Sequence, residues 1–162
     1  MGRAINNKLL VALSAILTQQ ESATEYTAAA IEKLLDYVAT DPNDGILFRK
    51  SDMILAAHAD AGFLNESRSR SRSGAHIFLS ENEPKPKLNG PILTIALIIK
   101  TVMALAAEAE MAALFITAKK MIPLRHTLIE MGWPHPKTHI QTDNSTAVGF
   151  TNKKIVNKAT KS

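Results

Sequence analysis

The sequence predicts a mixed α/β (α+β) fold, in which helices pack on a sheet of antiparallel strands that one parallel strand extends. Apolar residues recur at helical spacing over about the first 40 positions, whereas residues 46–98 contain short apolar runs separated by turn residues. Successive short strands of this kind favour antiparallel pairing. The last third alternates helix, strand and helix, and a strand reached through a long helix favours a parallel position in the sheet.

The composition is that of one globular domain. The chain has 162 residues, 46% of them hydrophobic, and a net charge of +4, which tolerates a phosphate-bearing partner without requiring one. The absence of cysteine excludes a disulfide scaffold, a thiolate zinc site and a cysteine nucleophile, and is consistent with a reducing intracellular compartment. We expect no signal peptide and no membrane partner, because the longest apolar run is shorter than the roughly 18 residues that span a bilayer.

The N-terminal part of the chain is predicted to be helical. Residues 5–19 carry leucine and isoleucine every three or four positions, which indicates an amphipathic helix. Ser22 and Glu25 form a capping-box pattern that predicts the start of a second helix, and a Thr-Asp-Pro-Asn-Asp-Gly turn ends it. We expect this turn to separate a helical segment, residues 1–45, from the domain formed by residues 46–162.

Strands are predicted in the middle of the chain and helices after it. The strands are expected over residues 46–48, 53–63, 75–79 and 92–98, with a proline-rich loop before the last. Residues 103–121 are good helix formers, Pro123 should kink or break that helix, and residues 124–131 should resume it with Gly132 as its cap. A further strand and a short helix are expected over residues 138–142 and 144–150.

Acidic residues stand at three places where their chemistry needs an explanation. Asp60 lies inside an otherwise apolar strand, so it is paired, protonated or ligating, unless it faces water at a strand end. Glu108 and Glu110 lie about 200° apart on their helix, so only one can reach a given site, and both can equally be surface acids. Asp143 follows a strand and precedes a helix, where either it or Asn144 can serve as the helix cap.

The end of a strand leading into a helix is also where ligand and metal sites collect in mixed sheets. Three acids on three elements can converge there. Converging carboxylates repel one another, and hard divalent cations, usually Mg²⁺, are the common remedy.

Four ordered strings carry a resemblance to a known family. They are His-Ala-Asp-Ala-Gly-Phe from residue 58, Arg-Ser-Arg-Ser-Gly from residue 70, Ala-Ala-Glu-Ala-Glu-Met-Ala-Ala-Leu from residue 106, and Thr-Asp-Asn-Ser-Thr-Ala from residue 142. Together they resemble the ribonuclease H domain of copia-type retrotransposon polyproteins. The helices before residue 46 are similar to the segment that connects the reverse-transcriptase portion of such polyproteins to the ribonuclease H portion.

The resemblance implies a ribonuclease H-like fold, with three antiparallel strands, one parallel strand and flanking helices. It implies two-metal hydrolysis of RNA in RNA/DNA hybrids, with Mg²⁺ or Mn²⁺ held by Asp60, Glu110 and Asp143. Glu110 is preferred to Glu108 because it precedes Met111-Ala112-Ala113-Leu114, so Glu108 would face outward or contact a metal ligand. The implied partners are the hybrid and the remainder of a reverse-transcriptase polyprotein.

The sequence also departs from the family pattern. A fourth acid lies in the family beyond a Thr-Lys element similar to Thr160-Lys161-Ser162, where this chain stops. Gly62 and Phe63 stand where an aromatic residue is common after the first acid. Apolar Leu97 and Leu105 stand at positions where polar residues are expected. We therefore expect a C-terminally truncated domain whose hydrolysis is impaired by loss of the fourth carboxylate. The alternative is an inactive remnant that binds nucleic acid or protein.

Basic residues suggest where nucleic acid would lie. The Ser-Arg repeat over residues 67–73 invites a splicing-factor or nuclear-signal interpretation, but turn residues before it and an apolar strand after it favour a hairpin with its arginines on one face. The expected nucleic-acid contacts are Arg68, Arg70, Arg72 and Asn144, and lysines of the C-terminal tail can add to them or simply be solvated.

Two histidine features have a simple interpretation. His135 and His139 have a zinc-like spacing, but Pro136 stands between them and the chain has no cysteine, which argues against a zinc site. His58 precedes Asp60 by two residues and shares its strand face, so it either supports a metal ligand or is an ordinary core or edge histidine.

Overall fold

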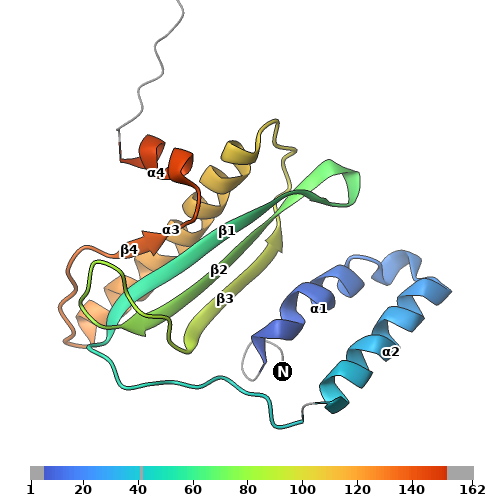
Figure 1. The fold of residues 1–162 in the computed structure, drawn as a ribbon, viewed down its shortest axis with the longest axis horizontal. Coiled ribbons are helices and arrows are strands. Elements are labelled where there is room, and N and C mark those ends of the chain that lie inside the picture. Colours follow the sequence, from blue (N-terminus) through green and yellow to red (C-terminus); the bar gives the residue numbers. More distant parts are fainter. Residues whose placement is uncertain (1–5, 41, 153–162) are drawn as a thin grey trace, which may run out of the picture.

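The computed structural model describes residues 6–40 and 42–152, and in this part the chain forms a four-stranded mixed sheet flanked by helices (Figure 1). The predicted class, a mixed α/β fold with three antiparallel strands and one parallel strand, is confirmed. The strands are β1 (Ile54–Glu66), β2 (Arg70–Ser80), β3 (Pro91–Ile98) and β4 (His139–Gln141). The α-helices are α1 (Leu10–Leu17), α2 (Glu25–Thr40), α3 (Ala106–Glu130) and α4 (Ser145–Thr151), with short 3₁₀ turns at Asn7–Leu9, Gln20–Ser22 and Ser67–Ser69.

The sheet has the strand order β3-β2-β1-β4. β1 pairs antiparallel with β2 through the turn at Ser67–Ser69, and β2 pairs antiparallel with β3. β4, reached through the long helix α3, lies parallel to β1, as the sequence predicts for a strand that follows a helical crossover. This topology places β1 between a hairpin partner and the strand that leads to α4.

One face of the sheet is covered by α3, which crosses it behind β1 and β2 in Figure 1. Because side chains alternate along a strand, the odd-numbered positions of β1 and β2 face this helix. The core between them contains Leu55, Ala57, Ala59, Ala75, Ile77, Ile95, Met121 and Leu128. Alanines at the contact let helix and sheet approach closely, and the even-numbered positions are left on the opposite face.

The helix α3 runs through Pro123, so the expected break at this residue is wrong. A proline inside a helix forfeits a backbone hydrogen bond and costs about 3 kcal/mol. Met121 and Leu128, on either side of the proline, are buried against the sheet, and this packing holds the helix continuous. The predicted cap at Gly132 is confirmed: its φ is 89°, and the Trp133 and Gly132 amides donate to the carbonyls of Leu128 and Ile129, both at 3.0 Å.

The N-terminal helices lie at the β3 side of the sheet, where α1 contacts β3 and α2 packs on α1 (Figure 1). The first helix is shorter than the predicted 5–19, with a 3₁₀ turn in front of it, and residue 5 lies outside the described residues. The predicted Ser22 and Glu25 capping box is wrong, because the helix begins at Glu25 and the Thr24 amide donates to Thr27 Oγ1 at 3.1 Å. The division of the chain at residue 45 stays a prediction.

The predicted strand at residues 46–48 is wrong. The segment from Gly45 to Met53 pairs with no strand, and Leu47 and Phe48 are 69% and 59% exposed. These two apolar side chains are not buried, so strand pairing here would gain no stabilisation from packing. Instead the Asn89 side chain holds the segment by accepting from the Arg49 amide at 2.8 Å and donating to the Arg49 carbonyl at 2.9 Å.

Within residues 6–40 and 42–152, every helix is too short or too polar to cross a lipid bilayer.

Candidate metal centre

The pairing register of the sheet brings Asp60 and Asp143 to the same level. In the parallel pair, His58 lies opposite Gln141, and each strand then advances two residues to its aspartate. Asp60 therefore lies within β1 on the face opposite α3, with Gly74 of β2 as its neighbour on the other side. Asp143 follows β4 by two residues and precedes α4. The alternative placed Asp60 at a strand end facing water: the strand end is wrong, since β1 continues to Glu66, but the side chain is exposed.

The helix α3 supplies the third carboxylate from its first turns. Glu110 falls on the same helical face as Ala113, Thr117 and Met121, because these positions are three or four residues apart and all are buried. Its side chain is 8% exposed, which is unusual for an acid. The face that packs α3 on the sheet therefore also carries Glu110 to the strands.

Asp60, Glu110 and Asp143 form one group, in which one carboxylate oxygen of each residue lies within 4.8 Å of those of the other two. No ion pair of the described residues joins any of the three to a lysine or arginine. Burial raises the pKa of Glu110, and the negative charges of Asp60 and Asp143 raise it further. The group is thus an accumulation of negative charge that the protein itself does not neutralise.

Such a group fits a hard divalent cation. Carboxylate oxygens are the ligands that Mg²⁺, Ca²⁺ and Mn²⁺ prefer, and the three side chains come from three separate elements that can surround an ion. Bringing the carboxylates together costs free energy that a bound cation recovers. The predicted set of three residues is therefore able to hold a metal ion.

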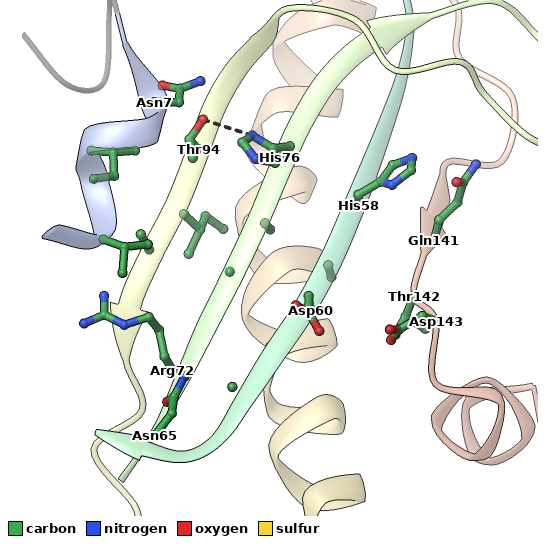
Figure 2. A pocket seen from close by; sticks show the side chains of 18 residues that line it. Asn7, His58, Asp60, Asn65, Arg72, His76, Thr94, Gln141, Thr142 and Asp143 are labelled. Carbon is green, nitrogen blue, oxygen red and sulfur yellow. Dashed lines mark hydrogen bonds between the residues drawn. The ribbon is translucent and has the colours of Figure 1, made fainter. Parts of the chain in front are cut away.

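The start of α4 explains why Asp143 is available. Asn144 is the helix cap, and its side-chain oxygen accepts from the Ala147 amide at 3.0 Å. The Thr142 hydroxyl accepts from the Asn144 amide at 3.3 Å and lies 3.5 Å from Glu110 Oε2. Of the two capping candidates in the sequence, Asn144 takes the role, and Asp143 is left to face Asp60 (Figure 2).

Glu108 lies outside the group, as the sequence predicts. Its side chain is exposed and accepts from the Ala104 amide at 2.8 Å, just before the start of α3. Negative charge at a helix N-terminus is favourable, so Glu108 has a structural role there. His135 and His139 are not members of this group, and the absence of a zinc site stays a prediction.

A cavity of about 660 Å³ opens on the sheet face that carries Asp60, between the strands and α1 (Figure 2). Asp60, Thr142 and Asp143 line one part of it, and polar residues of the sheet, the β1–β2 end and α1 continue the wall. These are His58, Gln141, His76, Thr94, Asn65, Arg72 and Asn7. Sequence reasoning did not single out His76, Thr94, Asn65 or Gln141, although strand periodicity places His76 on the face of Asp60.

The two histidines of this face lie on neighbouring strands. The His58 ring lies 5.4 Å from the Phe78 ring, tilted by 47°. His76 lies opposite His58 in the register, with its Nδ1 3.4 Å from Thr94 Oγ1. Burial lowers the pKa of His76, and the neighbouring His58 lowers it further. His76 is therefore neutral at physiological pH.

The three arginines of the Ser-Arg repeat have different positions. Arg68 lies in the β1–β2 turn, and Arg70 donates from Nε to the Ser67 carbonyl at 3.1 Å. Arg72 is 6% exposed and lies at the cavity. The predicted hairpin is confirmed, but its arginines do not form one exposed row.

The fold and the site together define a mixed α/β domain with a carboxylate group that can hold a metal ion. Comparison with known proteins adds no family, because no family model, curated protein or solved structure matches the chain.

Proposed function

We propose that this chain is a ribonuclease H-like domain of the copia retrotransposon type, which hydrolyses RNA in RNA/DNA hybrids with divalent metal ions. The observation that carries the proposal is the group of Asp60, Glu110 and Asp143, whose ligand atoms lie within 4.8 Å of one another. The resemblance implies these same three positions from sequence motifs alone. That motif positions distant in sequence meet in space is the strongest support for the proposal.

The connectivity of the sheet gives further support. The first carboxylate lies on a strand inside the sheet, the second near the start of the long helix, and the third just after the parallel strand. The resemblance implies the same order of strand, helix and strand. Each carboxylate thus has both a motif and an element that agree with the proposed fold.

Mg²⁺ or Mn²⁺ would be held by Asp60, Glu110 and Asp143. When bound, such an ion supplies an activated water and stabilises the leaving 3′ oxygen of the cleaved RNA. Asp60 and Asp143 are exposed and offer oxygens at the open cavity, whereas buried Glu110 is fixed by the packing of α3. The cavity face would receive the hybrid through its shape, its phosphates and its 2′-hydroxyl groups.

The partners and the surrounding contacts follow from the same proposal. Arg68 and Arg70, in and beside the β1–β2 turn, would contact phosphates of the hybrid. The oxygen of the Asn144 side chain is occupied by the α4 cap, so its contact with nucleic acid would use the amide nitrogen. The helices α1 and α2 would represent the connection segment, with the remainder of a reverse-transcriptase polyprotein as partner.

Impaired hydrolysis belongs to the first candidate, and an inactive remnant that binds nucleic acid or protein is the second. The resemblance implies four carboxylates, and among the described residues the group contains three. Because each ligand contributes to holding the metal, we expect turnover below that of a four-carboxylate site.

The test is cleavage of a labelled RNA/DNA hybrid by the 162-residue chain with Mg²⁺ or Mn²⁺. We expect cleavage that is lost in Asp60→Asn and kept in Glu108→Gln, which removes an acid outside the group. Hybrid binding without cleavage at any metal concentration would favour the binding module. The absence of both cleavage and salt-dependent hybrid binding would overturn the proposal.

A further inference from the structure

Buried polar atoms without a partner gather at one cavity. Seven buried side-chain nitrogen and oxygen atoms of the described residues have no hydrogen-bond partner, and four of them belong to residues that line the 660 Å³ cavity. They are Asn7 Oδ1, His58 Nε2 and both terminal nitrogens of Arg72. Each such atom costs about 1–3 kcal/mol. Their concentration at a single cavity indicates a ligand that satisfies them.

Arg72 is the charged member of this group. Its side chain is 6% exposed, and its Nε donates to Glu66 Oε1 at 2.5 Å. A guanidinium has five N–H donors, and this single contact uses one of them. Nη1 and Nη2 hold the other four and have no partner among residues 6–40 and 42–152. A guanidinium stays charged in proteins, so loss of its proton cannot relieve this arrangement.

The strand opposite Arg72 is adapted to leave room there. Gly62 pairs with Arg72 across β1 and β2. A Cβ atom at Gly62 would lie 1.9 Å from Asn65 Nδ2, so the Asn65 amide lies against the strand where Gly62 has no side chain. Asn65 and Arg72 line the cavity together (Figure 2). An amide and a guanidinium with unused donors thus lie at the same part of the wall.

We propose that the Arg72 end of the cavity binds a phosphate group. Guanidinium nitrogens bind phosphate through paired N–H···O bonds, and the Asn65 amide adds a neutral donor. Asp60 and Asp143 line the same cavity, so this phosphate lies beside the carboxylate group and not within it. The phosphate belongs to a nucleic-acid backbone or is a free phosphate, and the first source rests on the proposed function.

Access to Arg72 involves α1. Nη1 and Nη2 are covered in this conformation, and Leu10 and Val11 of α1 line the same cavity. This helix is attached to the edge strand β3 and not to the centre of the sheet. Phosphate binding therefore requires Nη1 and Nη2 to become accessible, and a shift of α1 is the route that we propose.

The site is tested by titrating the 162-residue chain with inorganic phosphate in EDTA, at constant ionic strength, with isothermal calorimetry. We expect saturable binding that Arg72→Gln weakens about tenfold or more, because hydrogen bonds to a charged group are lost. Arg49→Gln is the matched control, since this arginine is exposed and does not line the cavity, so the variant removes the same charge and should keep the affinity. Equal affinity in the wild type and in Arg72→Gln, or no saturable binding, overturns the proposal.

A second variant keeps the test decisive where Arg72→Gln does not fold. Glu66→Gln removes the anion that competes for Arg72, and we expect it to tighten phosphate binding several-fold. Unchanged or weaker binding in Glu66→Gln contradicts the assignment of Arg72 as the phosphate ligand.

Two further experiments identify the source of the phosphate and test the phosphate site separately from the proposed function. If an RNA/DNA hybrid displaces phosphate in EDTA, the site binds a backbone phosphate. If it does not, the site binds free phosphate. Both outcomes require that the wild type binds phosphate at Arg72. Asp60→Asn removes a negative charge from the cavity, so it should tighten phosphate binding slightly while it abolishes cleavage. Failure of cleavage alone therefore leaves the phosphate site standing.

Discussion

Replacement of Glu110 by glutamine should stabilise the metal-free protein. The carboxylates of Asp60 and Asp143 lie within 4.8 Å of Glu110. At this distance two like charges repel by about 3 kcal/mol at an effective dielectric constant of about 20, and by about 1 kcal/mol in bulk water. Asp60 and Asp143 are exposed, which favours the lower value. We therefore expect a gain of about 1–2 kcal/mol near pH 8.

The assay is thermal unfolding in EDTA, and Glu32→Gln is the control because it removes an exposed acid of α2 that lies outside the group. For a domain of this size, 1–2 kcal/mol corresponds to a rise in Tm of about 2–8 °C. The order should reverse with Mg²⁺, because a ligand at about 100 times its Kd stabilises the wild type by about 2.7 kcal/mol and the variant has lost one ligand. Lower stability of Glu110→Gln in EDTA would refute the reasoning.

The pH dependence of the stability gain in Glu110→Gln tests the same explanation independently. The pKa of Glu110 is raised on folding, so protonated Glu110 contributes stability that is fully present below its ordinary pKa and is lost as pH rises through the folded value. The advantage of Glu110→Gln should therefore be small at pH 4 and should grow toward pH 8. An equal advantage at both pH values contradicts charge repulsion as its cause.

Three further substitutions have defined outcomes. Pro123→Ala should stabilise the protein by about 1–3 kcal/mol in urea unfolding, because the residue is exposed inside α3 and alanine restores a backbone donor; a loss of stability would contradict the continuous helix. Gly132→Ala should destabilise by about 1 kcal/mol in the same assay, since φ is 89° and open space surrounds the position, and an unchanged midpoint would argue against the cap. Asn144→Ala should cost about 1 kcal/mol of stability through loss of the α4 cap. It should also weaken Mg²⁺ binding measured by calorimetry, because Asp143 is its neighbour. Unaltered metal affinity would show that the cap does not position Asp143 for metal binding.

Much of the sheet and of the carboxylate group could be predicted from sequence because each depends on local rules. Asp60 stands out as an acid in an apolar strand. Helical periodicity shows only that Glu108 and Glu110 face different sides, and the choice of Glu110 came from the family resemblance. Asp143 and Asn144 could not be told apart, because both residue types cap helices and only the backbone geometry shows that Asn144 does so.

What the sequence could not predict depends on contacts between distant segments. Residues 46–48 have the apolar run of a strand, but they pair with no strand, and Leu47 and Phe48 are exposed. The arginines of the Ser-Arg repeat are equivalent in sequence, yet the pairing of β1 and β2 and the position of α1 cover Arg72 and leave Arg68 exposed. The continuous helix through Pro123 likewise depends on packing against the sheet, which a local helix rule does not include.

The most direct test of the central claim follows each strand of an RNA/DNA hybrid separately in the presence of Mg²⁺. The account predicts cleavage of the RNA strand alone, no cleavage of the DNA strand or of duplex DNA, and loss of activity in EDTA and in Asp143→Asn. Cleavage that ignores the type of strand, or that persists in Asp143→Asn, would contradict the assignment of Asp60, Glu110 and Asp143 as a metal centre for hybrid hydrolysis.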